Sequence, residues 1–187
     1  MKFTTDWFTH NIPNFELCTK TAPDNKMYLE IGCFEGRSTC WMLQNALAKD
    51  GKDGTIICVD PYAPESHLWK LFNTNPLANF KENTAEVIGK DQTLKLIQLP
   101  SYEGLAKLIT EGLQFDFIYV DGDHRPHMAL MDGCMAWGLL KQGGTMLFDD
   151  YLYPEKPTKD GVDAFLKGYE GLYEIIVNNY QLGIKKL

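Results

Sequence analysis

The sequence predicts an α/β fold in which a mostly parallel, seven-stranded sheet is covered by helices on both faces. Short apolar runs alternate with helical stretches along most of the chain, which is typical of parallel strands joined by crossover helices. The final two apolar runs are separated only by Asn178, Asn179 and Tyr180, a spacing that predicts an antiparallel hairpin. The 187 residues fit one domain with a sizeable core, so we expect a single domain over residues 1–187.

The predicted strands are recognised by their apolar composition and by the residues that end them. Pro61 and Pro100 close the second and third runs, and carboxylates close the fourth and fifth. Continuous apolar runs of this kind indicate strands that are buried on both faces of a parallel sheet. The expected strands are residues 27–32, 55–60, 94–99, 116–121 and 143–150, followed by the hairpin strands 172–177 and 181–185.

The predicted helices lie between these strands and carry start and stop signals. Ser38 is a good N-cap for the first helix, and Pro126 suits the first turn of another that ends before a pair of glycines. The aromatic and proline-rich stretch 61–69 predicts a long loop over the edge of the sheet, and residues 50–54 predict a turn. The expected helices are residues 38–48, 77–87, 102–111, 126–140 and 160–167.

Composition and charge limit the classes of partner. The net charge of −7 argues against nucleic acid as the main partner, because phosphate backbones attract basic surfaces. No apolar stretch approaches the roughly 20 residues that span a bilayer. The first residues lack an apolar signal segment, so we expect a cytoplasmic protein with no membrane partner. The five cysteines form no Cys-x-x-Cys pair, which favours small buried thiols over zinc or disulfides.

Three carboxylates follow the fourth and fifth predicted strands, at Asp121, Asp149 and Asp150. Ligands of open α/β sheets bind outside the carboxyl ends of the strands, and neighbouring strands would deliver these side chains to one edge. Carboxylates gathered in this way repel one another unless a cation or a proton neutralises them. Because oxygen ligands suit a hard divalent ion, the pattern predicts a metal site, with solvated loop acids as the alternative.

A glycine-containing turn joins the first strand to the first helix, over residues 30–38. Gly32 and Gly36 permit a tight turn and close approach of a ligand, and the helix N-terminus offers free N–H groups. Asp60 ends the next strand, where a carboxylate can bind both hydroxyls of a ribose, and Glu30 suits a ligand with an ammonium group. The pattern is not the dinucleotide fingerprint, because Phe34 replaces its middle glycine.

These segments resemble the motifs of the class I S-adenosylmethionine-dependent methyltransferases. The turn at residues 30–39 is similar to their first motif, and Val59-Asp60 is similar to their ribose-binding acidic end. Residues 121–124 and 143–151 are similar to later motifs of small O-methyltransferases, including sugar O-methyltransferases of the macrocin type. The resemblance runs from about Asp6 to the C-terminus and implies a Rossmann-like fold that uses S-adenosylmethionine.

A similarity to catechol-type O-methyltransferases adds a metal ion. Those enzymes place an Asp after the fourth strand and an Asp-Asn or Asp-Asp pair after the fifth, and these hold a magnesium ion that binds the substrate hydroxyls. Asp121 matches the first position and Asp149-Asp150 match the pair, at a similar spacing of 28 residues. A basic residue three positions after the first Asp is their general base, so the resemblance assigns this role to His124, where they have lysine.

The resemblance also implies which residues bind the donor. Glu30 would approach the methionine ammonium and Asp60 the ribose, while Ser101 and Tyr102 would lie against the adenine. The remaining residues expected around the donor are Gly32, Phe34, Gly36, Ser38 and Asp121. Those expected to line the acceptor site are His67, Trp69 and Tyr151.

We therefore expect methyl transfer from S-adenosylmethionine to a hydroxyl of a small molecule, such as a sugar or a catechol-like ring, assisted by Mg²⁺ or another divalent ion. Three alternatives remain open: a metal-independent N-methyltransferase, a non-catalytic S-adenosylmethionine-binding protein and, more remotely, a nicotinamide-dependent oxidoreductase. A homodimer is compatible with the resemblance, because small enzymes of this fold often build part of the site from a neighbouring subunit.

Overall fold

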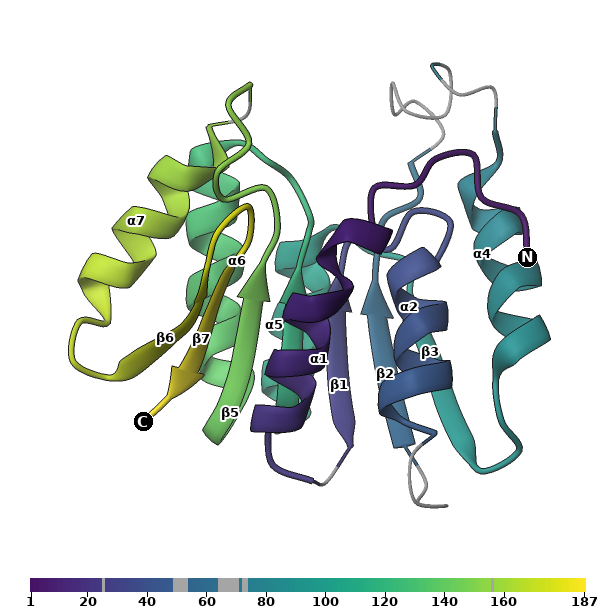
Figure 1. Cartoon of the computed structure of the whole chain (residues 1–187), viewed down its shortest axis with the longest axis horizontal. Helices are drawn as coiled ribbons and strands as arrows, with labels where there is room; N and C mark the ends of the chain where they lie inside the picture. The colour runs from purple at the N-terminus through teal and green to yellow at the C-terminus, as the bar shows by residue number, and fades with distance from the viewer. Residues whose placement is uncertain (25, 49–53, 64–70, 72–73, 156) are drawn as a thin grey trace.

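The computed structural model describes residues 1–24, 26–48, 54–63, 71, 74–155 and 157–187. Its strands are β1 Met27–Ile31, β2 Gly54–Val59, β3 Gln92–Ile97, β4 Phe115–Val120, β5 Leu140–Phe148, β6 Tyr173–Asn178 and β7 Leu182–Lys186. They form one seven-stranded sheet with the order β3-β2-β1-β4-β5-β7-β6 (Figure 1). β1 to β5 are parallel, and β7 is antiparallel to both β5 and β6. The sheet confirms the predicted α/β class and the hairpin.

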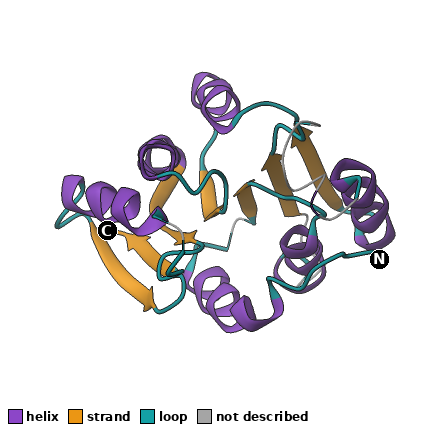
Figure 2. Ribbon diagram, turned by 90° about the horizontal axis from the view of Figure 1, so that it is seen from above, coloured by secondary structure: helices purple, strands orange, loops and turns teal. Residues whose placement is uncertain are grey.

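Helices cover both faces of this sheet, as the view from above shows (Figure 2). They are η1 Thr9–Asn11, α1 Ile12–Thr21, α2 Arg37–Trp41, the π-helical η2 Met42–Ala46, α4 Pro76–Val87, α5 Ser101–Thr110, α6 Pro126–Leu139 and α7 Thr158–Gly168. On one face, a core that includes Phe15, Met42 and Phe80 joins α1, η2 and α4 to the sheet. On the other face, a second core that includes Leu105 and Phe165 packs α5, α6 and α7 against the sheet.

The helix α1 lies in a segment for which the sequence analysis predicts no helix. Its signals are local and short: Pro13 stands in the first turn, and Phe15 and Cys18 are buried three residues apart on one side. None of the described helices is both long and apolar enough to cross a membrane. Most of the turn predicted at 50–54 lies outside the described residues, and Gly54 begins β2.

The start of α2 differs from the prediction. Its N-cap is Gly36, which has a left-handed φ of 78°, and the helix begins at Arg37. The prediction that Ser38 caps this helix was wrong, because Ser38 lies inside the first turn and its hydroxyl donates to the buried Glu30 instead. The backbone freedom of glycine therefore replaces a side-chain cap at this position.

The register of the sheet brings the predicted site residues to one edge. Ile31 of β1 pairs with Val59 of β2 and with Val120 of β4, and Val120 pairs with Phe148 of β5. The residue after each of these lies at the carboxyl edge, which is the upper edge in Figure 1. These residues are Gly32, Asp60, Asp121 and Asp149.

Candidate active site

The turn between β1 and α2 has the tight backbone that its glycines predict. Gly32 and Gly36 have φ values of 83° and 78°, and Phe34 between them has φ 46°, which is uncommon for a residue with a side chain. A Cβ on Gly32 would lie 1.9 Å from the carbonyl oxygen of Asp121. Only glycine therefore fits where the ends of β1 and β4 meet.

Asp60, directly after β2, holds this turn in place. Its Oδ2 accepts hydrogen bonds from the backbone N–H groups of Cys33 at 2.9 Å and Phe34 at 3.2 Å. Its Oδ1 accepts one from the N–H group of Tyr62 at 2.8 Å. Burial raises the pKa of the Asp60 carboxyl, although the three N–H groups oppose the shift. The residue predicted to bind the ribose thus also shapes the turn that would surround the methionine.

Glu30 is fully buried beneath the turn. It accepts hydrogen bonds from the hydroxyls of Ser38 and Thr39, both in the first turn of α2. Burial raises the pKa of Glu30 from 4.5 to about 8, so the carboxyl is mostly protonated at neutral pH. Glu30 and Ser38, both predicted to bind the methyl donor, are therefore hydrogen-bonded to each other. Ser38 is partly exposed, whereas Glu30 is buried.

The predicted adenine residues open the helix α5. Ser101 is partly buried, and Tyr102 is 44% exposed. The sequence analysis missed a third polar group beside them, Asp132 of α6, which is 1% exposed and leaves its Oδ1 without a hydrogen-bond partner among the described residues. Burial raises the pKa of Asp132 to about 6, a shift that the Ser101 hydroxyl opposes. Its Oδ2 lies 2.9 Å from the place of a Cβ on Gly122.

Asp121, His124 and Asp150 form a group of potential metal ligands at the edge of the sheet. One ligand atom of each lies within 4.8 Å of the others. His124 Nε2 is 2.8 Å from Asp150 Oδ2 and 3.5 Å from Asp121 Oδ1. The side chains of Asp121 and His124 are 32% and 35% exposed, and that of Asp150 is 6% exposed. The group is therefore open to a ligand on the side of Asp121 and His124.

Asp149, the third predicted ligand, lies behind this group and is not part of it. Its Oδ2 accepts a hydrogen bond from the Tyr119 hydroxyl at 2.5 Å. Its Oδ1 accepts bonds from Gln181 Nε2 at 3.1 Å and from the backbone N–H of Asp150 at 2.8 Å. Burial and the nearby charge of Asp121 raise the pKa of Asp149. Two adjacent acids thus have different surroundings.

Several partners of these acids have no motif in the sequence. Tyr119 lies two residues before Asp121 on β4, and strand alternation places both side chains on one face. Tyr180 and Gln181 come from the turn between β6 and β7, and their hydrogen bonds to the acids span 30 and 32 residues. Only the Tyr119 contact could have been inferred from local spacing.

Of the three residues predicted to line the acceptor site, the structure describes Tyr151. Tyr151 is mostly buried, and its hydroxyl donates to Asp163 of α7 at 2.8 Å. His67 and Trp69 lie outside the described residues. Nearby, Asp123 forms an ion pair with Arg125 at 2.6 Å.

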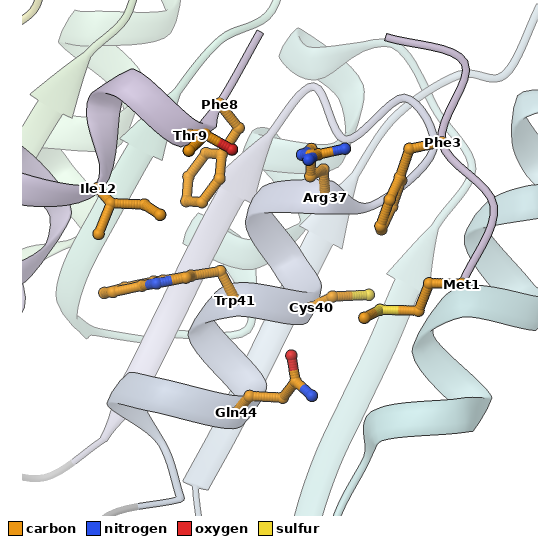
Figure 3. A pocket seen from close by; sticks show the side chains of 9 residues that line it. All are labelled: Met1, Phe3, Phe8, Thr9, Ile12, Arg37, Cys40, Trp41 and Gln44. Atoms are coloured by element: carbon orange, nitrogen blue, oxygen red, sulfur yellow. The ribbon is translucent and has the colours of Figure 1, made fainter. Parts of the chain in front are cut away.

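A pocket of about 170 Å³ lies between the N-terminal segment and α2 (Figure 3). Most of its lining is apolar and includes Phe3, Phe8 and Trp41, with Arg37 also in the lining. None of the residues predicted to bind donor, acceptor or metal lines this pocket, so it is separate from the candidate site.

A family model described as a methyltransferase domain matches residues 29–151, which is more than half of the chain. The chain belongs to this methyltransferase family. The matched span of the methyltransferase begins within β1 and ends just after β5, so it includes the acids and the turn between β1 and α2, here called the donor turn because it is predicted to bind the donor. This match confirms the resemblance to class I S-adenosylmethionine-dependent methyltransferases.

Solved methyltransferase structures have the same fold. An O-methyltransferase from Bacillus cereus in complex with SAH is 16% identical, with 97% of this chain and 82% of that chain covered and a TM-score of 0.65. CalS11, a TDP-rhamnose 3′-O-methyltransferase of calicheamicin biosynthesis, is 11% identical, with 97% and 81% covered and a TM-score of 0.66. A putative rRNA methylase from Clostridium thermocellum is 16% identical, with 94% and 96% covered and a TM-score of 0.68. At these identities the likeness shows the fold.

A curated relative of this methyltransferase is the uncharacterized protein R132 of Acanthamoeba polyphaga mimivirus. The two are 29% identical over 130 residues, which is 68% of this chain and 52% of the relative. The chain therefore spans about half the length of the curated relative that it matches.

Proposed function

We propose that this methyltransferase transfers the methyl group of S-adenosylmethionine to a hydroxyl of a small molecule, and that a divalent ion assists the transfer. The observation that carries the proposal is the group of Asp121, His124 and Asp150 at the carboxyl edge of the sheet. The backbone of Asp121 touches Gly32 of the donor turn, so the donor residues and the acids meet at one place. CalS11, which has this fold and is described as a TDP-rhamnose 3′-O-methyltransferase, supports a small acceptor.

The donor set of this group fits a divalent ion. Mg²⁺ is usually bound by one or two carboxylates and keeps several waters, and Asp121 and Asp150 can supply two carboxylates. Asp149 is the less favoured ligand, because its oxygens accept hydrogen bonds from Tyr119, Gln181 and the backbone of Asp150, whereas Asp150 Oδ2 lies in the group with His124 and Asp121. An ion at this place would lower the pKa of an acceptor hydroxyl.

The residues of the chain would orient the reactants and receive the proton. The acceptor oxygen attacks the methyl carbon, and the bond between carbon and the sulfonium sulfur breaks, so positioning in line is the main requirement. His124 is the proposed general base, since the Asp150 carboxylate at 2.8 Å would stabilise the imidazolium that forms. Ser38 and Asp60 would hold the methionine and ribose portions of the donor.

The test combines donor binding with methyl transfer to a panel of catechols and sugars. We expect S-adenosylmethionine to bind with or without Mg²⁺, and transfer to require Mg²⁺. Asp150→Asn should lose transfer and keep donor binding. Absence of donor binding would overturn the proposed reaction, whereas full activity in the presence of a chelator would overturn only the role of the metal.

RNA is the second candidate acceptor. One structural neighbour is described as a putative rRNA methylase, and 96% of its chain is covered. The net charge of −7 opposes binding to a phosphate backbone. Transfer to ribosomal RNA, and to none of the small hydroxylated compounds, would favour this alternative.

A further inference from the structure

The turn between β6 and β7 contacts both acids that follow β5. The Tyr180 hydroxyl donates a hydrogen bond to Asp150 Oδ1, and Gln181 Nε2 donates one to Asp149 Oδ1 at 3.1 Å. Two consecutive residues of the hairpin therefore bind two consecutive carboxylates. Each carboxylate has its own partner, so the hairpin distinguishes the two acids.

The backbone of Asp150 explains why the two carboxylates separate. Asp150 has φ 52°, a left-handed conformation that is uncommon outside glycine, and its N–H group donates to Asp149 Oδ1 at 2.8 Å. Its Oδ2 is 2.8 Å from His124 Nε2, while its Oδ1 accepts the bond from Tyr180. One oxygen of Asp150 thus faces the proposed base and metal site, and the other is held by the hairpin.

Tyr180 is itself held by neighbours from η1 and from the segment that follows β5. Its ring lies edge-on to His10 of η1, with centroids 5.3 Å apart, and edge-on to Tyr153 at 6.1 Å. Its carbonyl oxygen accepts a hydrogen bond from the N–H group of Leu152 at 3.1 Å. Asn14 of α1 donates to Gln181 Oε1 at 2.9 Å, next to Tyr180. These contacts hold the ring and backbone of Tyr180 in place, so that its hydroxyl points at Asp150.

We propose that Tyr180 is a positioning residue that holds the Asp150 carboxylate in the orientation required for a bound divalent ion and for His124. A hydrogen bond to a charged carboxylate is stronger than a neutral one, and it fixes which oxygen faces the site. Without the Tyr180 hydroxyl, the Asp150 carboxylate can rotate. Binding of the ion must then also fix the orientation of this carboxylate, which weakens the binding. This inference rests on the proposed metal-assisted function.

Metal binding tests the inference without an acceptor. Mn²⁺ alone is titrated calorimetrically into the wild type, Tyr180→Phe, Tyr169→Phe and Asp150→Asn. Groups that orient metal ligands typically contribute 10-fold or more in affinity, so we expect Tyr180→Phe to raise the Mn²⁺ dissociation constant about 10-fold. Tyr169 is the matched control, because its ring packs on Trp137 and Phe165 and the same hydroxyl is removed there.

Binding of SAH and the thermal unfolding midpoint show whether Tyr180→Phe remains folded. We expect SAH binding to match the wild type, because the ring and its contacts remain, and a single cooperative unfolding transition at a slightly lower midpoint, because one hydrogen bond to Asp150 is lost. Wild-type Mn²⁺ affinity in Tyr180→Phe, together with lost affinity in Asp150→Asn, would overturn the positioning role and leave the metal site standing. Absence of Mn²⁺ binding by the wild type would overturn the metal site and this inference with it. An equal loss in Tyr169→Phe would attribute the effect to a general loosening of the fold and would also overturn it.

Discussion

Gly32 and Gly171 share a left-handed backbone and differ in what surrounds them. Their φ values are 83° and 84°. A Cβ on Gly32 would lie 1.9 Å from a backbone oxygen of Asp121, whereas a Cβ on Gly171 would meet nothing within 4 Å. The pair therefore separates the cost of the backbone conformation from the cost of crowding at the junction of β1 and β4.

We expect Gly171→Ala to lower the free energy of unfolding by about 1 kcal/mol, the cost of a left-handed conformation for a residue with a Cβ. Gly32→Ala should lower it by about 3 kcal/mol or more, because the backbone oxygen of Asp121 must also move. Urea denaturation measures both values. Equal losses would show that β1 and β4 can separate at little cost.

The buried carboxyl of Glu30 makes stability depend on pH. Burial raises its pKa from 4.5 to about 8, so its contribution to stability is fully present below pH 4.5 and is lost as the pH rises toward 8. Glu30→Gln keeps a neutral side chain, and we expect it to flatten this fall. Urea denaturation at pH values from about 5 to 9 measures the slope. Glu82→Gln, at an exposed position of α4, should keep the wild-type slope.

At the scale of elements, the donor turn depends on the strand beside it. Asp60 binds the N–H groups of Cys33 and Phe34, so β2 determines the shape of the turn that follows β1. Asp60→Asn loses the charge and offers one acceptor oxygen in place of two. We expect the dissociation constant for SAH to rise about 10-fold, which corresponds to roughly 1.4 kcal/mol.

Calorimetry with SAH measures this change. Asp91→Asn is the control, because Asp91 is exposed and immediately precedes β3, at the opposite end of that strand from the carboxyl edge. Unchanged affinity in Asp60→Asn would mean that Asp60 neither binds the ribose nor shapes the donor turn.

The five parallel strands could be predicted because each is an apolar run followed within a few residues by glycine, proline or aspartate. The convergence of Asp121, Asp149 and Asp150 at one edge followed from the adjacency of β4 and β5. The separation of Asp149 from Asp150 could not be predicted, since it depends on the φ of 52° at Asp150 and on the distant residues Tyr180 and Gln181. Such contacts exist only once the hairpin has docked, and no local period encodes them.

At the scale of the whole molecule, a bound ion should stabilise the entire fold. Its proposed ligands Asp121 and Asp150 follow β4 and β5, which pair with each other at the centre of the sheet, so unfolding disperses the site. At a concentration of about ten times the dissociation constant, an ion that binds only the folded chain adds about 1.4 kcal/mol to the free energy of unfolding. We expect Mg²⁺ to raise the unfolding midpoint of the wild type and of Asp91→Asn, but not of Asp121→Asn. The same rise in Asp121→Asn would place the ion elsewhere.

The contacts of the hairpin with Asp149 and Asp150 also set an order of events during synthesis. Both acids leave the ribosome about 30 residues before Tyr180 and Gln181, the residues that hold them. Until then, β5 has no β7 beside it, and the two carboxylates lack those partners. A nascent chain that already contains the whole family match at 29–151 still lacks Tyr180 and Gln181, so the contacts that hold Asp149 and Asp150 apart form only after the hairpin has emerged.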